Sequence, residues 1–141
     1  MKSRKQIRAT RSRRTGAACV EFAITASLLI LILLGCVDFG RFVYAYVSVS
    51  NTACEGANFG SLHGVAEFGN VGNWRTAVVN ATLAENNDIS ISASDVTVDT
   101  SVLTNKIVSV QVVHQFQLLT AWPGLPATLT LTRKAVMPIT I

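Results

Sequence analysis

The chain has 141 residues, half of them hydrophobic and 14% charged, with a formal net charge of +4. This length fits one domain plus an anchor, and so apolar a composition indicates a membrane segment rather than a wholly soluble protein. From Ala17 onward there are five basic and eight acidic residues, a net charge of −3, which disfavours a nucleic-acid-binding body. The other seven basic residues are Lys2, Arg4, Lys5, Arg8, Arg11, Arg13 and Arg14.

The first predicted elements are a basic leader peptide at residues 1–16 and a transmembrane segment at residues 17–37. The second stretch carries one charge, Glu21, and includes the uninterrupted aliphatic run Leu28–Leu34. As a helix it would span ~31 Å, close to the hydrocarbon thickness of a bilayer. A buried helix of a soluble protein does not explain the run, because the run has no polar face. We therefore expect one membrane-spanning helix.

The orientation of this span follows from the charges that flank it. Basic residues crowd its N-terminal side, whereas Arg41 is the only basic residue within about 20 residues after it. The positive-inside rule therefore predicts a cytoplasmic N-terminus and an extracytoplasmic C-terminal domain. An ordinary cleaved secretory signal would end in small residues after the apolar core, where this chain has Asp38-Phe39-Gly40-Arg41. The topology signal nearest the span consists of Arg11, Arg13 and Arg14.

The helix is predicted to continue outside the membrane over residues 38–60. Apolar and small residues keep helical spacing through this stretch, and no proline occurs before residue 123. The residues with this spacing are Phe42, Ala45, Tyr46, Val49, Ala53 and Ala57.

Residues 61–141 are predicted to form a small extracytoplasmic α+β domain. A glycine-rich loop opens it, and residues 73–85 are expected to form a second, amphipathic helix that Asn86-Asn87-Asp88 would stop. Four residues share the apolar face of this helix: Trp74, Ala77, Val78 and Ala81.

The rest of the domain is predicted to be a small antiparallel sheet. Its clearest strand is 106–118, in which every second residue from Val108 onward is apolar except His114, and Ser109 faces the other way with three glutamines. Pro123-Gly124 marks a turn, so this strand and the next would pair as a hairpin. The predicted strands are 89–91, 96–98, 106–118 and 127–132. The fold class is therefore α+β, a long N-terminal transmembrane helix followed by a second helix and a small antiparallel sheet.

The junction between leader and span carries the functional signal. Gly16 ends the leader, and Glu21 is the fifth residue after it. This spacing resembles the type IV prepilin cleavage pattern, which implies a cut after the glycine. A glycine lets an extended backbone approach a protease closely. A cut between Gly16 and Ala17 would put a new amine and the Glu21 carboxylate at i and i+4 on one helical face. Charges ~4 Å apart attract by roughly 4 kcal/mol at an effective dielectric near 20. The alternative is a membrane-edge glutamate without a special role.

This junction resembles the type IV prepilin cleavage pattern, and the residues after it resemble the TadE-like family. Members of that family are minor pilins or pseudopilins of the Tad (Flp) pilus. The resemblance implies cutting by a prepilin peptidase, retention in the bacterial inner (cytoplasmic) membrane and use of Glu21 in assembly. It also implies other pilin-like subunits and pilus assembly platform proteins as partners. The resembling residues are Glu21-Phe22-Ala23, Asp38-Phe39-Gly40-Arg41, Tyr44, Asn51, Ala53 and Glu55-Gly56-Ala57. The family often has arginines where this chain has Cys54 and Asn58.

No pattern in the chain indicates catalysis or a ligand. No phosphate loop, nucleophile elbow or paired-carboxylate signature occurs, and His63 and His114 have no partner at metal-ligand spacing. We therefore expect no enzymatic activity, no cofactor, no metal site, no small-molecule substrate and no nucleic-acid partner. Two alternatives stay open. One is an uncut single-span protein with an extracytoplasmic binding or sensing domain, and the other is a leader that binds acidic lipid or nucleic acid.

Three cysteines are present, and so odd and scattered a set predicts no disulfide framework. Cys19 and Cys36 are expected to be buried as small hydrophobic residues. The role of Cys54, as a free thiol or an intermolecular partner, stays open.

Overall fold

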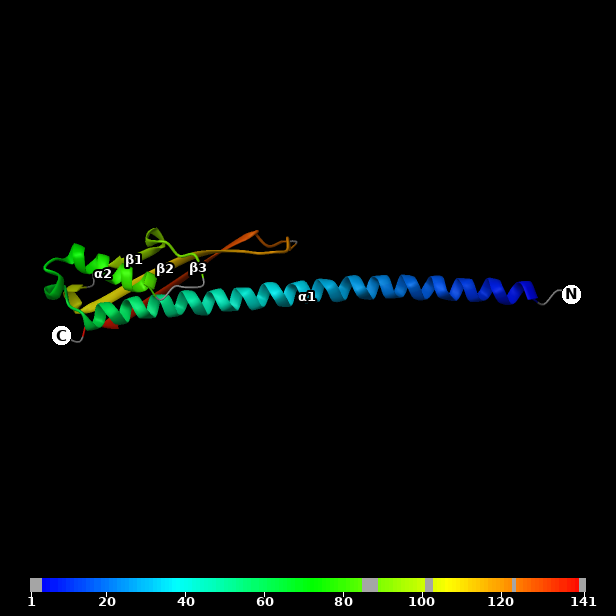
Figure 1. Cartoon of the computed structure of the whole chain (residues 1–141), viewed down its shortest axis with the longest axis horizontal. Helices are drawn as coiled ribbons and strands as arrows, with labels where there is room; N and C mark the ends of the chain where they lie inside the picture. The colour runs from blue at the N-terminus through cyan, green and yellow to red at the C-terminus, as the bar shows by residue number, and fades with distance from the viewer. Residues whose placement is uncertain (1–3, 85–88, 101–102, 123, 140–141) are drawn as a thin grey trace. The chain divides into compact units, whose positions relative to one another are not determined.

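The computed structural model describes residues 4–84, 89–100, 103–122 and 124–139, with side chains from Gly16 onward apart from Asn105 (Figure 1). Two α-helices and a three-stranded antiparallel sheet occupy this part of the chain, which confirms the α+β class. The chain divides into two compact units, Met1–Phe39 (unit 1) and Gly40–Ile141 (unit 2). The elements are α1 (Arg4–Leu62), α2 (Val71–Ala84), β1 (Val96–Asp99), β2 (Ile107–Gln117) and β3 (Thr128–Pro138), with short 3-10 turns at Val65–Phe68, Ala93–Asp95 and Leu103–Asn105.

Unit 1 consists of the first part of α1 and carries the predicted span. Each residue of Leu28–Leu34 is 42–58% exposed, because the described part of unit 1 contains no second element to pack on it. The helix begins at Arg4, whereas the sequence predicts a helix from about Ala17. The leader has no proline and is rich in arginine and lysine, which favour helix. The border between leader and span is therefore a change in chemistry and not a break in the backbone.

Unit 2 uses the second part of α1 as one wall of its core. The predicted helical continuation is confirmed, and it runs slightly further than expected, to Leu62. Small side chains on its inner face bring the α1 backbone close to the sheet, so that a Cβ added at Gly60 would lie 2.9 Å from Cγ2 of Val108. The inner-face residues, each at most 3% exposed, are Ala45, Val49, Ala53 and Ala57.

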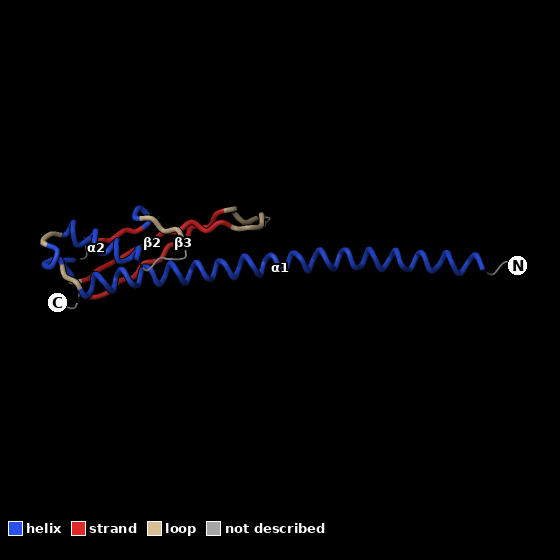
Figure 2. Tube along the Cα trace, in the orientation of Figure 1, coloured by secondary structure: helices blue, strands red, loops and turns tan. Residues whose placement is uncertain are grey.

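The second helix and the sheet complete this core. Trp74 and Val78 of α2 are fully buried, as their spacing predicts. The sheet has the strand order β1-β2-β3 with both pairs antiparallel. Figure 2 shows its strands in red. In the central strand, Val110 is fully buried between Val98 of β1 and Ala135 of β3. The predicted β2–β3 hairpin is thus confirmed, and because β1 is short, the turn half of the hairpin extends past it.

Ser109 departs from the predicted alternation of β2. It was expected on the solvent face, yet it is 1% exposed. The cause is its place near the start of the central strand, where it pairs with Asp99 of β1 on one side and Val136 of β3 on the other. Its Oγ finds no hydrogen-bond partner among the described residues, which is costly for a buried hydroxyl.

Two strand predictions are wrong in place or extent. Residues 89–91 form no strand, because the Ile91 N–H donates to the Ile89 carbonyl at 2.9 Å and a 3-10 turn capped by Ser92 and Asp95 follows. Both isoleucines pack against the core, so their alternation with serine reflects burial of a loop. β3 continues past the expected end at residue 132 to Pro138, because pairing with β2 holds it extended. The predicted stop at residues 86–88 lies outside the described residues.

Candidate processing and assembly site

Gly16 lies within α1 on an exposed stretch of helix. A Cβ placed on it would meet no atom within 4 Å, so packing does not require a glycine at this position. Glycine is nevertheless less favourable than alanine in a helix interior by ~1 kcal/mol. Gly16 therefore weakens the helix locally without serving the fold. This property suits a peptide bond that has to leave the helical conformation before a protease can cut it.

Glu21 lies one turn after Ala17, and both residues are exposed on α1. At this spacing they share one face of the helix. On the next turn, the Thr25 hydroxyl donates to the backbone carbonyl of Glu21 at 2.9 Å. In the uncut chain the nitrogen of Ala17 belongs to a peptide bond and carries no charge, so only cleavage can create a cation there. The carboxylate is otherwise bordered by exposed apolar side chains, namely Val20 (60%), Phe22 (75%) and Ile24 (67%).

The leader arginines are placed by their backbone alone. Arg11, Arg13 and Arg14 lie within α1, and their side chains lie outside the described part of the structure. The predicted topology signal, the predicted cleavage point and Glu21 thus follow one another along the part of α1 that belongs to unit 1.

The cysteines differ from expectation. All three are free and exposed, so the prediction that Cys19 and Cys36 are buried is wrong for the protein by itself. The reason is that unit 1 offers nothing to pack on them, and lipid is the apolar surrounding that a membrane would supply. Cys54 belongs to unit 2, where it borders a shallow hollow lined also by Asn51, Glu55, Asn58 and Met137. Across the described residues, no three His, Cys, Asp or Glu side chains gather where they could hold a metal ion.

The exposed apolar surface of α1 has a direct consequence. From Gly16 to Leu62 the helix is long and apolar enough to cross a membrane, and it is the one such helix in the described part of the chain. None of its most apolar stretch is buried, unlike the core helix of a soluble protein. Apolar area left in water costs roughly 25 cal/mol per Å², and a bilayer removes that cost.

Taken together, the fold and the exposed helix define a membrane-anchored α+β protein. Residues 16–58 match the family model described as TadE-like protein. This match, which covers 43 of the 141 residues, confirms the resemblance over that segment. It begins at Gly16, ends in the wall that α1 contributes to unit 2, and leaves α2 and the sheet outside. No curated protein and no solved structure was found to match the chain.

Two contacts in unit 2, at Gly56 and at Arg41, were not predicted from the sequence. Gly56 was recognised only by family resemblance, yet a Cβ there would overlap the Thr82 hydroxyl and lie 3.3 Å from Cγ1 of Val110. Arg41 was taken as a residue flanking the span, yet its guanidinium lies over the Phe116 ring, 5.2 Å from the centroid. The spacing of glycine among the small residues of the inner face could have indicated the first contact. The second joins residues far apart in sequence, so no local pattern signals it.

Proposed function

We propose that the chain is a minor pilin or pseudopilin that a prepilin peptidase cuts between Gly16 and Ala17. The mature subunit then takes part in assembly of a Tad-type (Flp) pilus or a related secretion machinery. Its leader lies in the cytoplasm, α1 crosses the inner membrane, and unit 2 lies outside. The role is one of assembly, without a chemical reaction of its own.

One observation carries this proposal: a glycine that the fold does not need stands at the first residue of the TadE-like match. It follows the basic leader, and Glu21 follows it at the spacing of the prepilin cleavage pattern. Since no packing contact explains Gly16, selection by a protease supports its presence better than selection by the fold does. Because α1 includes Gly16, cutting requires local unwinding, and a residue with poor helix propensity lowers the cost of that step.

Glu21 supplies the assembly step of the proposal. Cleavage turns the Ala17 nitrogen into an ammonium, one helical turn from the carboxylate. This ammonium can pair with Glu21 of its own chain or of a neighbouring subunit, and the second arrangement fixes how far one helix is shifted along the next. A carboxylate facing lipid alone would cost about 2.5–3.5 kcal/mol at the bilayer centre, and pairing offsets part of this penalty. The exposed aliphatic side chains of α1 then pack against neighbouring helices in place of lipid.

N-terminal sequencing of the protein from its native membrane tests the proposal. The mature chain should begin at Ala17, and Gly16→Val should leave a precursor that begins at Met1. The variant is informative because the space around Gly16 is open and the fold accepts the added methyl groups. Gly40→Val is the matched control, since Gly40 also lies in α1 with no atom near a Cβ, and it should be processed normally.

A wild-type protein that retains Met1 would sink the proposal and favour an uncut single-span protein with an extracytoplasmic binding or sensing domain. Equal processing of the Gly16→Val and wild-type chains would contradict the assigned cleavage point.

A further inference from the structure

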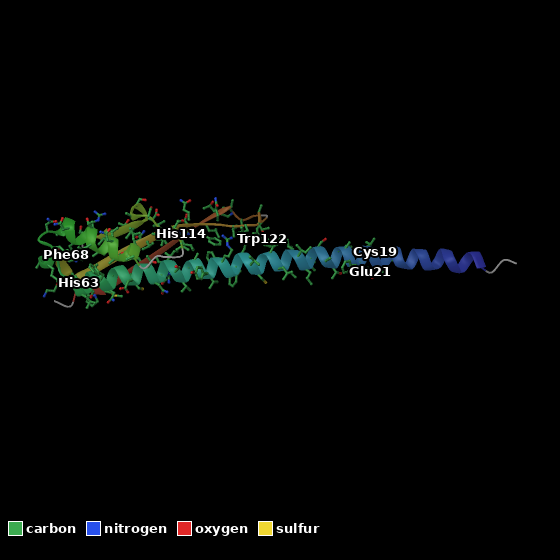
Figure 3. All side chains as sticks on the ribbon, in the orientation of Figure 1. Cys19, Glu21, His63, Phe68, His114 and Trp122 are labelled. Carbon is green, nitrogen blue, oxygen red and sulfur yellow. The ribbon has the colours of Figure 1, made fainter. Side chains whose placement is uncertain are left out.

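The sheet of unit 2 has two faces with different surroundings. Residues of α1 and α2 pack in one core with Val98 of β1, Val110 of β2 and Ala135 of β3. By alternation along the strand, His114 of β2, labelled in Figure 3, belongs to the same face. Residues between these positions point to the opposite side. We call that side the outer face, and neither α1 nor α2 packs on it.

Two neighbouring rungs of the outer face are rich in polar side chains. In one rung, Gln111 of β2 pairs with Thr97 of β1 and Lys134 of β3. In the next rung, Ser109 of β2 pairs with Asp99 of β1. Side chains directly opposite in a sheet lie ~5 Å apart and diagonal ones ~7–8 Å, so these residues converge on one small area. All five line a hollow of about 310 Å³, which we call the outer-face hollow.

The hydroxyl of Ser109 is the unusual feature of this hollow. Ser109 is 1% exposed, so it lies at the floor, and its Oγ has no hydrogen-bond partner among the described residues. A buried hydroxyl without a partner destabilises a fold, because it has given up its hydrogen bonds to water. Alanine would avoid this penalty, so packing by itself does not account for a serine here. A bound group that exchanges a hydrogen bond with the hydroxyl does account for it.

The side chains around the hollow define the chemistry of such a ligand. Lys134 only donates hydrogen bonds, Asp99 only accepts them, and their opposite charges leave the five side chains without net charge. The hydroxyls of Thr97 and Ser109 and the amide of Gln111 can both donate and accept. The matching ligand is therefore uncharged and carries several groups that also do both, as sugar hydroxyls do. An anion would meet the carboxylate of Asp99, and a cation would meet the ammonium of Lys134.

The size of the hollow agrees with a small polar ligand. Sites for small molecules commonly enclose ~300–1,000 Å³, and this hollow, at about 310 Å³, lies near the lower limit. One sugar ring with its hydroxyls suits this space, whereas a folded segment of another protein does not. Val136 of β3, which pairs with Ser109, is 56% exposed and offers an aliphatic surface to the C–H groups of a sugar ring.

We propose that the outer-face hollow of unit 2 binds a neutral saccharide, with Ser109, Gln111 and Lys134 as its main hydrogen-bonding residues. The Ser109 hydroxyl gains a partner at the floor. The Gln111 amide binds two neighbouring sugar hydroxyls, and Lys134 donates to the ligand from β3. This inference goes beyond the proposed function and does not depend on cleavage or assembly, because all the residues that it uses belong to unit 2.

Retention of protein-bearing liposomes on sugar-coated beads tests the proposal. Full-length protein is reconstituted in phosphatidylcholine liposomes without glycoside detergents, whose sugar headgroups would occupy the site. Separate beads carry glucose, galactose, mannose, N-acetylglucosamine or heparin, and many copies on one liposome strengthen a weak contact. At least one of the neutral sugars should retain the liposomes, and the same free sugar should elute them. Retention should persist in high salt, because a neutral ligand is not screened.

Two variants place the contact in the hollow. Ser109→Ala should weaken binding of that sugar about threefold to tenfold, measured by saturation-transfer NMR, because one hydrogen bond is lost. Without sugar, the same variant should unfold no more easily than the wild type in denaturant, since alanine removes an unpaired buried hydroxyl. Lys134→Met should weaken binding to a similar extent.

Matched controls lie outside the hollow. Thr130→Ala removes a hydroxyl from the same face of β3, where Thr130 pairs with Gln115, and Arg75→Met removes an exposed cation from α2. Both should bind the sugar as the wild type does.

Three results would each overturn the proposal. The first is that no neutral sugar retains the liposomes. The second is retention on heparin alone, lost in high salt and by Lys134→Met but kept by Ser109→Ala, which would assign the outer face to an anion. The third is retention on a neutral sugar that both Ser109→Ala and Lys134→Met keep, which would place the binding site elsewhere.

Discussion

The two parts of α1 share one helical backbone but meet different surroundings. In unit 1 the aliphatic side chains of residues 28–34 stay exposed, whereas in unit 2 every turn of the helix places a small residue against α2 or the sheet. Lipid accepts any aliphatic side chain, so unit 1 requires little beyond length and apolarity. A packed core tolerates few shapes, so unit 2 requires particular residues. A residue of unit 1 that is not apolar therefore points to function. An unusual residue in the core of unit 2 points instead to packing.

The glycines of α1 illustrate this difference. Gly16 and Gly40 have open space where a side chain would go, whereas Gly56 and Gly60 have a neighbour too close for one. Glycines of one helix thus have different explanations. At Gly56 and Gly60 packing explains the glycine, and at Gly16 and Gly40 no packing contact among the described residues does.

The largest effect is expected from a substitution of Glu21, a charged residue in the region that requires only apolar side chains. Glu21→Gln keeps the size of the side chain and removes its charge. The variant should insert at least as well as the wild type, because an amide is cheaper in lipid than a carboxylate. Pilus assembly should be lost or fall sharply, because no carboxylate remains to pair with the Ala17 ammonium. The paired measurement is the amount of mature protein by immunoblot and piliation by microscopy of the same cells.

Glu67→Gln provides the control, because Glu67 is an exposed acidic residue of unit 2 and lies far from the span in sequence. It should leave piliation intact. If cells with the Glu21→Gln protein at native level are piliated normally, the pairing role is refuted. Glu21 is then a membrane-edge residue without a special role.

Alanine substitutions at two glycines of α1 test the difference between a packed and an open position. Gly56→Ala should lower the free energy of unfolding by about 1–3 kcal/mol, because the added methyl overlaps the Thr82 hydroxyl in a filled core. Turning Thr82 aside offers little relief, since its hydroxyl donates to the Val78 carbonyl at 2.7 Å. Gly40→Ala should instead raise the stability by up to ~1 kcal/mol, because alanine is the better helix former and meets no atom there.

Denaturant unfolding of the detergent-solubilised protein, followed by emission of the buried Trp74, measures both variants. Opposite signs are expected. A Gly56→Ala protein as stable as the wild type would refute the packing role of this glycine.

The smallest expected effect concerns a loop of unit 2. The backbone N–H of Ser92 donates to Asp95 Oδ2 at 2.9 Å and the Ser92 hydroxyl at 2.7 Å, and these bonds lower the pKa of Asp95 below its ordinary value of 3.8. Because the folded pKa lies below the unfolded one, the carboxylate stabilises the fold above pH 3.8, and this contribution disappears as the pH falls through the lowered value. Asp95→Asn should be slightly less stable than the wild type at neutral pH.

The two proteins should converge at low pH when their unfolding midpoints are compared across a pH series. A difference that stays constant with pH would mean that the Asp95 charge does not stabilise the turn.

Local patterns predicted the parts of the fold whose surroundings are uniform. The span followed from a continuous apolar run, the inner face of α1 from small residues at helical spacing, and the β2–β3 hairpin from alternation on either side of Pro123-Gly124. The candidate cleavage point and Glu21 could be located for the same reason, since the leader, the glycine and the span are adjacent in sequence. Predictions failed where a residue's environment came from distant segments. Ile89 and Ile91 alternate as a strand would but belong to a buried loop, and Ser109 is covered by its neighbouring strands.

By itself, then, the sequence determined a basic leader, one apolar helix and a small α+β domain, because charge, hydropathy and periodicity act over a few residues at a time. Only the tertiary structure decided that Gly56 lies against Thr82, that Gly16 has open space, and that Arg41 lies beside Phe116 at the base of an uncharged loop. These relations join residues separated by tens of positions, or depend on the absence of a neighbour. Relations of the first kind form only when the helix and the sheet pack together, and neither kind leaves a mark in the local order of residues.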